Sequence, residues 1–361
     1  MKQKFYRLTN IEKKNAQYNI LLGERSNGKS YAVKEKCLSD AWNNQDKKFI
    51  LLRRWDLEIK PNLSEAYFKD APISVITKNE CDGVSVYNHK IFLTKFDEKT
   101  NKNVKIKHVG YTMALTMEQH YTSGVYTDVK NVIFEEFISR DYYLPQEPQK
   151  LMQLISTVAR RETIKVYMIG NTISRLCPYF TAWDLRNIPK QKQGSIDTYS
   201  YKTDQMNEDG TPVIILIAVE FCENSGHNST MFFGSASKMI TGGAWQTEEL
   251  PTLEEPLYKY SEIYHLFIKV MNFTFFCHLL LDDNGGAVWY VEPKTTPIHR
   301  NERVITDDMF YIVKNPYATK FEPLSTVESE ALQLMRSGKI CYSDNLTGSD
   351  FRSCIKTLTI S

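Results

Sequence analysis

The sequence is poor in the residues that build flexible linkers and cross-linked frameworks. Its 361 residues include only 16 glycines and 13 prolines, so no long linker is expected. The seven cysteines are scattered and form no C-x-x-C pair. This pattern argues against a disulfide framework and a structural zinc site, and it favours a reducing compartment. The first 17 residues contain no apolar signal core.

Long apolar runs and a strong net charge are also missing. Of the two most apolar stretches, 213–221 is too short to cross a membrane, and polar residues such as Lys269 and His278 interrupt 264–281. The formal net charge is +2, so the overall charge does not indicate a nucleic-acid binder, although it allows a local basic patch. A cytoplasmic protein with no membrane partner is expected.

The residues that are present indicate a globular α/β protein of two or three domains. Residues 18–22 form a short apolar run that ends at Gly23, which is typical of a buried strand. Residues 29–42 have the apolar spacing of an amphipathic helix, and 48–53 form a second apolar run. A strand, helix and strand in this order predict a right-handed parallel βαβ unit.

The rest of the first part adds strands and one further amphipathic helix. We expect strands or hairpins at 73–77, 84–94, 104–115, 131–137, 164–170 and 213–221, and a helix at 147–161. A second unit is expected from residue 253, with two strands around Asp-Asp-Asn-Gly-Gly and helices at 326–336 and 349–357. The predicted domains are 1–222 and 253–361, joined by a linker or lid at 223–252.

The strongest motif lies between the first strand and the first helix. It matches G-x-x-x-x-G-K-[ST] at every fixed position, with the residues Gly23, Glu24, Arg25, Ser26, Asn27, Gly28, Lys29 and Ser30. In such a loop the backbone N–H groups surround a phosphate, the lysine reaches the β- and γ-phosphates, and the serine binds Mg²⁺. The sequence therefore predicts binding of a nucleoside triphosphate with Mg²⁺.

A second motif is an apolar strand that ends in two acids, Glu135 and Glu136. In a P-loop enzyme the first acid orients water on Mg²⁺ and the second polarises the attacking water. Aspartate is usual at the first position, and the longer side chain of Glu135 would act on the metal through a water or at a different reach. Asn171 follows another strand, where it either senses the γ-phosphate or satisfies a local turn.

Arginines and lysines supply further candidates. An arginine finger could come from Arg160 or Arg161 after the second helix, or from Arg53 or Arg54 after a strand; each could equally be a surface or helix-end arginine. A basic hairpin is a weak candidate for binding DNA phosphates, and a solvated charged hairpin is the alternative. Its lysines are Lys95, Lys99, Lys102, Lys105 and Lys107.

Other classes of P-loop protein fit the sequence less well. A GTPase needs N-K-x-D, and Asn101-Lys102-Asn103-Val104 fails at its last position. A small-molecule phosphotransferase needs an acceptor pocket and usually an arginine-rich lid, and we find no convincing one. The intact Lys29, Ser30 and Glu136 argue against a scaffold with a relict loop. Another ATPase that acts on nucleic acid, such as a helicase or a recombination ATPase, remains the alternative.

The order of these motifs resembles that of the DNA-packaging ATPases of phi29-like bacteriophages, which are relatives of the large terminase subunits. The resemblance covers most of the first 180 residues and becomes weak after about 185. It rests on GERSNGKSYAVK, FILLRRWDLE (49–58), YTDVKNVIFEEF (126–137), LMQLISTVARRE (151–162) and MIGNTISRLCPYF (168–180).

The resemblance implies an ASCE/RecA-like P-loop ATPase with a mostly parallel sheet, followed by a smaller α+β domain that resembles a vestigial RNase H-like nuclease. By position, Arg25 would be the P-loop arginine, Glu136 the catalytic glutamate, and Arg160 or Arg161 the arginine supplied in trans. The candidate first strand of the second domain, 264–270, offers no carboxylate, so no nuclease activity is expected.

The resemblance also implies a motor and its partners. ATP hydrolysis would move double-stranded DNA into a preformed viral shell. The partners would be the DNA, further copies of the chain in a ring that is pentameric in the resembled family, the portal of the procapsid and a structural prohead RNA. The protein would work in the host cytoplasm, transiently docked on the procapsid.

Overall fold

The computed structural model describes residues 6–24, 27–121, 124–139, 143–160, 163–172, 177–223, 249–271 and 273–360. They form two compact units. The described residues of the first unit lie between 6 and 223, and those of the second between 249 and 360. The part of the chain that is described contains no helix long and apolar enough to span a bilayer.

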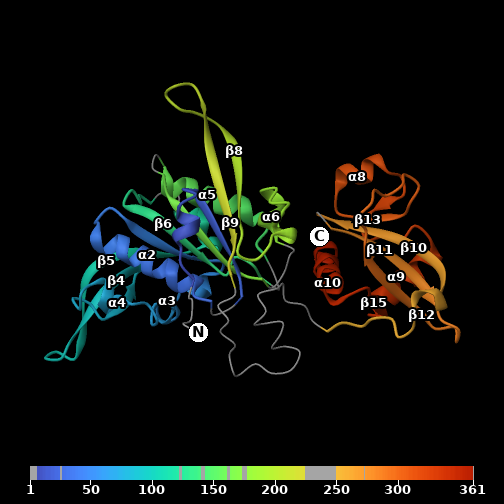
Figure 1. The fold of residues 1–361 in the computed structure, drawn as a ribbon, viewed down its shortest axis with the longest axis horizontal. Coiled ribbons are helices and arrows are strands. Elements are labelled where there is room, and N and C mark those ends of the chain that lie inside the picture. The colour runs from blue at the N-terminus through green and yellow to red at the C-terminus, as the bar shows by residue number, and fades with distance from the viewer. Residues whose placement is uncertain are drawn as a thin grey trace. The chain divides into compact units, whose positions relative to one another are not determined.

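A mixed, mostly parallel sheet forms the centre of the first unit (Figure 1). Its described strands number nine, in the order β3-β4-β5-β2-β6-β7-β1-β9-β8. The six strands from β5 to β9 in that order are parallel, while β3, β4 and β8 run antiparallel to their neighbours. The strands are β1 (Tyr18–Gly23), β2 (Lys48–Arg53), β3 (Gly83–Tyr87), β4 (Lys90–Asp97), β5 (Lys102–Ala114), β6 (Val129–Glu135), β7 (Lys165–Asn171), β8 (Ile196–Met206) and β9 (Pro212–Phe221).

Helices cover both faces of this sheet. The chain crosses from β1 to β2 through α2 in one direction along the sheet, and from β6 to β7 through α5 in the other. Because such crossovers are right-handed, α2 and α5 lie on opposite faces. The helical segments are α1 (Thr9–Glu12), α2 (Lys29–Asn43), η1 (Asp56–Ile59), α3 (Pro61–Tyr67), α4 (Ile73–Ile76), η2 (Leu115–Tyr121), α5 (Glu147–Ala159), α6 (Pro178–Ala182) and η3 (Ile188–Lys190).

The central strands are apolar along their whole length because both of their faces are buried. The face toward α2 packs into one core cluster, to which β1, β2, β6 and β7 contribute Leu21, Leu51, Ile133 and Ile169. The α/β P-loop fold predicted from the sequence is confirmed, with β7 as the additional strand between β1, which leads into the P-loop, and β6, which carries the acids.

Two local predictions differ from the structure. Residues 73–77 were expected to be a strand, but Ile73–Ile76 form the short helix α4. Thr77 ends this helix: its Oγ1 donates to the Ile73 carbonyl at 2.9 Å and accepts the N–H of Cys81 at 3.0 Å. A short apolar run does not distinguish a strand from a helical turn, and the prediction was wrong for that reason.

The second difference is β8, a strand that was not predicted. It pairs with β9 as an antiparallel ribbon, and β1 pairs only with the inner residues of β9, 217–221. The outer half of the ribbon therefore extends past the parallel sheet (Figure 1). Polar residues alternate along β8 in the sequence, which is typical of a strand that is exposed to solvent.

The second unit contains a six-stranded described sheet in the order β14-β13-β10-β11-β12-β15. The antiparallel β10-β11-β12 meander is at its centre, and the outer strands join it in parallel. One face packs on α9 and α10, where Trp289 is fully buried and donates from Nε1 to the Ala331 carbonyl at 2.8 Å. The elements are η4 (Leu257–Lys259), β10 (Ser261–Val270), β11 (Phe273–Leu281), β12 (Ala287–Pro293), β13 (Val304–Thr306), α8 (Met309–Lys314), β14 (Ala318–Thr319), α9 (Thr326–Arg336), β15 (Ile340–Tyr342) and α10 (Asn345–Ile360).

A buried ion pair joins the end of β2 to the start of α5. Arg54 is 5% exposed, and Glu147, the first residue of α5, is fully buried. The Arg54 guanidinium donates from Nε and Nη2 to the two carboxylate oxygens of Glu147 at 2.8 and 2.9 Å. It also donates to the carbonyl oxygens of Glu136 and Phe137, at 3.3 and 2.6 Å. One side chain therefore holds β2, α5 and the loop after β6 together.

We predict that Arg54→Met lowers the free energy of unfolding by about 3–5 kcal/mol, because the Glu147 carboxylate stays buried without its cation. Urea unfolding of the full chain measures the change. The double variant Arg54→Met/Glu147→Met should recover much of the loss, since no buried charge remains. The control is Arg186→Met, which breaks the exposed contact between Arg186 and Asp184 and should cost less than about 1 kcal/mol. A loss in Arg54→Met no larger than in the control would contradict the prediction.

On the other face of the second sheet, carboxylates and imidazoles alternate. Glu262 accepts from His265 Nδ1 at 2.8 Å and from His278 Nδ1 at 2.5 Å, and His265 Nε2 lies 3.0 Å from Glu302. Burial lowers the pKa of His265, but the hydrogen bonds to Glu302 and Glu262 outweigh burial, and the net effect raises this pKa. Protonated His265 therefore stabilises the folded unit.

The raised pKa of His265 makes the stability of the folded unit depend on pH. The stabilisation from His265 is fully present below the unfolded pKa of about 6.5 and is lost as the pH rises through the higher folded pKa. We expect the ¹H NMR titration of the His265 ring to have its midpoint above about 6.5. In Glu302→Gln the midpoint should fall, because a neutral amide replaces the carboxylate. An unchanged midpoint in that variant would contradict the assigned cause.

Candidate active site at the carboxyl ends of the parallel strands

The P-loop joins β1 to α2, as the sequence predicted. Gly28 precedes the helix with φ of 94°, a left-handed conformation that favours glycine and turns the chain into α2. Lys29 is 3% exposed, and its Nζ donates to the Glu24 carbonyl at 2.5 Å and to Asn27 Oδ1 at 3.1 Å. Burial lowers the pKa of Lys29, an effect that neighbouring anionic groups oppose only in part. A bound phosphate would supply the negative charge that this buried lysine needs.

Ser30 and Glu135 meet at the floor of the site. Ser30 Oγ donates to Glu135 Oε1 at 2.6 Å, and the Tyr67 hydroxyl donates to Glu135 Oε2 at 2.7 Å. Both carboxylate oxygens therefore have a hydroxyl partner. Burial raises the pKa of Glu135, while the bonds from Ser30 and Tyr67 favour its charged form.

Glu136 follows β6 and has a left-handed backbone with φ of 56°. This conformation costs a non-glycine residue about 1–2 kcal/mol, and the Arg54 bonds to the Glu136 and Phe137 carbonyls hold it. The side chain is 58% exposed and lies 3.3 Å from Arg53 Nη2, which also lies 3.5 Å from Glu58. The turn therefore directs the Glu136 carboxylate away from the strand and into the open side of the site.

Next to the P-loop lies a cavity of about 560 Å³. Its lining could bind both an anion and a cation, because cationic side chains lie there together with carboxylates and hydroxyls. The lining residues are Ser30, Lys34, Leu51, Arg53, Glu58, Leu63, Ser64, Tyr67, Glu135 and Glu136.

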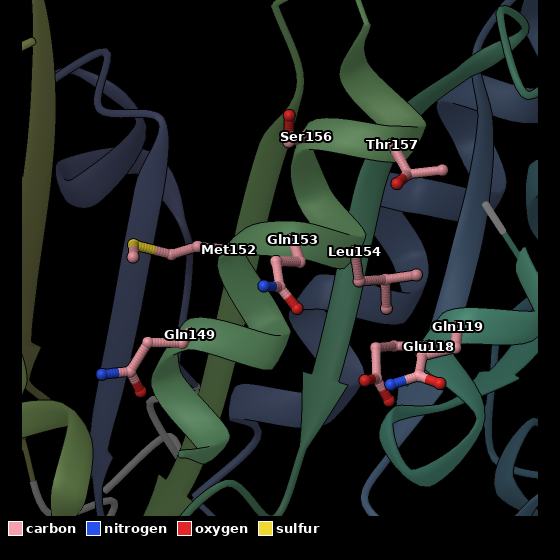
Figure 2. A pocket seen from close by; sticks show the side chains of 8 residues that line it. All are labelled: Glu118, Gln119, Gln149, Met152, Gln153, Leu154, Ser156 and Thr157. Carbon is pink, nitrogen blue, oxygen red and sulfur yellow. The ribbon is translucent and has the colours of Figure 1, made fainter. Parts of the chain in front are cut away.

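A second cavity of similar size lies between α5 and η2 (Figure 2). Its lining is mostly amide and hydroxyl groups with Met152 and Leu154, and its one acid, Glu118, pairs with Lys150 at 2.8 Å. It offers no cationic side chain in its lining and no P-loop, so it does not match the chemistry of a nucleotide site.

The residues of the first cavity fit a magnesium nucleotide. Mg²⁺ prefers oxygen ligands, and Ser30 Oγ can donate its proton to Glu135 while it offers a lone pair to a cation. Asn27 is 1% exposed, and its Nδ2 donates to no group in the described part of the chain. The loop therefore keeps a buried donor that a phosphate oxygen could satisfy.

Of the remaining predicted residues, Asn171 lies at this edge of the sheet and Arg160 lies away from it. Asn171 ends β7 and pairs in register with Gly23, so it lies beside the start of the P-loop. Arg160 follows the last residue of α5, and its Nη2 donates to the Gly124 carbonyl at 2.7 Å. The 13 residues of α5 place Arg160 about 20 Å along the helix from Glu147. Arg25, Ser26 and Arg161 lie outside the described residues.

The predicted lysines of the hairpin have different surroundings. Lys107 donates to the Trp42 carbonyl at 2.6 Å, and the Lys105 ammonium lies over the rings of Tyr87 and Phe92. Lys99 and Lys102 are exposed at the turn between β4 and β5. Among the predicted lysines, Lys99 and Lys102 therefore have the fewest competing side-chain contacts within the described part of the chain.

Sequence reasoning missed Tyr67, Lys34 and Glu147, and it treated Arg54 as a surface or finger arginine. Lys34 carries a weak signal, because it follows Ser30 by four residues and so shares its face of α2. Tyr67 and Glu147 come from separate elements, and no spacing links them to the motifs.

Several known proteins are similar to this chain in sequence. The family model for the podovirus DNA encapsidation protein (Gp16) matches residues 1–193. The chain is 28% identical over 173 residues to the DNA packaging protein of Bacillus phage phi29, a match that covers 46% of each chain. It is 30% identical over 171 residues to the DNA packaging protein of Bacillus phage B103, which covers 46% of this chain and 48% of that protein. The matched part thus spans about half the length of these relatives.

The fold is similar to that of a solved structure along nearly the whole chain. The chain in the bacteriophage phi29 viral genome packaging motor assembly superposes with a TM-score of 0.56 and 18% identity, over 98% of this chain and 99% of that one. With a matching fold, a P-loop with its acids at the strand ends, and a family model that spans residues 1–193 of 361, the chain belongs to the podovirus DNA encapsidation protein (Gp16) family.

Proposed function

We propose that this protein is an ATP-driven motor that moves double-stranded DNA into a viral procapsid. The observation that carries the proposal is the cavity that Ser30, Glu135 and Glu136 line next to the P-loop lysine, Lys29, in a member of this family. Relatives named DNA packaging proteins support the substrate and the process.

In the proposed reaction, water attacks the γ-phosphorus of ATP and the bond to the ADP oxygen breaks. Lys29 and the P-loop N–H groups hold the phosphates, and Glu136 accepts the proton of the attacking water. Ser30 and Glu135 would hold Mg²⁺, which neutralises charge on the phosphates. Asn171, beside the P-loop, is placed to contact the γ-phosphate and to respond to its release.

The proposed arginine finger acts between subunits of a ring. A β–α–β crossover returns the chain to the opposite edge of the sheet, and Arg160 lies at that end of α5. It is thus too far along the helix to reach the phosphates of its own subunit, which supports a role in trans for Arg160 or Arg161. Arg54 is unsuited to this role, because its guanidinium is buried and makes four hydrogen bonds within its own subunit.

The proposed second domain, 253–361, is a nuclease-like unit without nuclease activity, and 223–252 would link it to the ATPase domain, 1–222. Asp282 supports this reading, because its Oδ1 accepts the N–H groups of Asn284 and Gly286 at 2.8 and 2.7 Å and so forms the hairpin turn. The proposed partners are the portal of the procapsid, a prohead RNA and further copies of the chain in a pentameric ring that docks in the host cytoplasm.

Steady-state ATP hydrolysis with double-stranded DNA tests the proposal. We predict that Glu136→Gln and Arg160→Ala each lower kcat at least about 100-fold, because one removes the base and the other a charge at the transition state. A mixture of the two variants should recover part of the activity, since each supplies the residue that the other lacks.

The control is Arg186→Ala, which breaks an exposed contact with Asp184 and should leave kcat unchanged. Hydrolysis indifferent to Glu136, or an arginine defect that mixing does not rescue, would contradict the ring motor. Stimulation by single-stranded rather than double-stranded DNA would favour a helicase or a recombination ATPase.

We also predict that Lys99→Gln/Lys102→Gln weakens double-stranded DNA binding and reduces the slope of log affinity against log salt by about 2, since two phosphate contacts are lost. Fluorescence anisotropy across a salt series measures both. Lys107→Gln is the matched control, because its ammonium is held by Trp42 and should not contribute to the slope. Equal slopes in all three proteins would exclude the hairpin tip as a DNA contact.

A further inference from the structure

Three elements meet at the Walker-type acid Glu135, and only two of them belong to the P-loop motifs. Ser30 from α2 and Tyr67 from the end of α3 each donate a hydroxyl hydrogen to one oxygen of the Glu135 carboxylate. All three residues line the nucleotide cavity. The carboxylate is therefore held from both sides.

Tyr67 is itself held in place. Lys34 lies one turn after Ser30 on α2, and its Nζ donates to the Tyr67 carbonyl at 2.9 Å and pairs with Asp70. The same ammonium lies 4.6 Å from the centre of the Tyr67 ring. Lys34 is 3% exposed, whereas the side chain of Asp70 is 63% exposed, so the ammonium is buried and its carboxylate partner faces solvent. The tyrosine ring therefore has a fixed position relative to Ser30.

The second hydroxyl matters because the acid is a glutamate. Glutamate has one more methylene and one more rotatable bond than the usual aspartate, so its carboxylate reaches further and loses more freedom when it is ordered. Ser30 holds only Oε1, and a bond from Ser30 alone leaves the plane of the carboxylate free to turn. Tyr67 holds Oε2 and removes that freedom.

We propose that Tyr67 is a positioning residue for the metal side of the nucleotide site, where it orients Glu135 toward Mg²⁺ through its hydroxyl. The inference rests on the proposed function. It makes α3 part of the active site, although no motif of the P-loop fold includes this helix. When a residue that hydrogen-bonds to a metal-binding carboxylate is removed, the metal affinity commonly falls 10–100-fold.

Tyr67→Phe tests this role, because it removes one oxygen and keeps the ring over Lys34. The full chain is titrated with Mg²⁺ in the presence of a fluorescent ATP analogue, and the Mg²⁺-dependent fluorescence gives an apparent Kd. We expect this Kd to rise about tenfold in Tyr67→Phe, while binding of the analogue without Mg²⁺ is unchanged.

The chain offers a matched control. The Tyr167 hydroxyl donates to Glu12 Oε1 at 2.5 Å, and neither residue lines the nucleotide cavity. Tyr167→Phe therefore loses the same kind of tyrosine–glutamate bond and should keep the wild-type Mg²⁺ affinity. Thermal unfolding of both variants shows whether their losses of stability are comparable.

A double-mutant cycle isolates the contact. Aspartate at position 135 is too short to hold both hydroxyls, so Tyr67→Phe should change the Mg²⁺ Kd less than about twofold in a Glu135→Asp background. An additive tenfold effect in that background would overturn the proposal.

The remaining outcomes are equally decisive. Equal Mg²⁺ affinity in Tyr67→Phe and Tyr167→Phe would overturn the role of Tyr67. A loss of nucleotide binding without Mg²⁺ would assign Tyr67 a structural role instead. If the wild-type protein shows no Mg²⁺-dependent nucleotide binding, the proposed function fails rather than this inference.

Discussion

The charge of Arg54 lies inside the protein, and the edge of the first sheet that carries the candidate site is arranged around it. A buried guanidinium must satisfy its donors, and here Glu147 and the carbonyls of Glu136 and Phe137 do so. The start of α5 and the left-handed turn after β6 are thereby fixed together. This buried contact fixes the backbone of Glu136 and so positions its exposed carboxylate, although Arg54 itself does not line the cavity.

The two ends of α5 lie at opposite edges of the first sheet, because the helix runs from the carboxyl end of one parallel strand back to the amino end of the next. Its first residue, Glu147, lies at the edge where the parallel strands end, and Arg160 lies about 20 Å away along the helix. A subunit built in this way has its phosphate site at one edge and its candidate arginine finger at the other. In the proposed ring, the edge of one copy that carries the arginine would meet the phosphate edge of the next copy.

Within the site, positive and negative groups are held by different means. The Lys29 ammonium bonds to one carbonyl and one amide oxygen of its own loop, whereas Glu135 depends on hydroxyls from α2 and α3. Burial opposes charge on both, and it lowers the pKa of Lys29 and raises that of Glu135. A magnesium nucleotide would supply an anion to the lysine and a cation to the carboxylate, so binding would relieve both at once.

The sequence by itself determined the P-loop, the strand that ends in Glu135 and Glu136, the helices at 29–42 and 147–161, and the resemblance to the packaging ATPases. These features are local, and each is written in consecutive residues or in a regular spacing. The strand at 73–77 was wrong, because a short apolar run is compatible with a helical turn. Only the tertiary structure decided the contacts of Arg54 and Tyr67, because their partners Glu147 and Glu135 are far away in the chain, and burial and distance exist only once the sheet has formed.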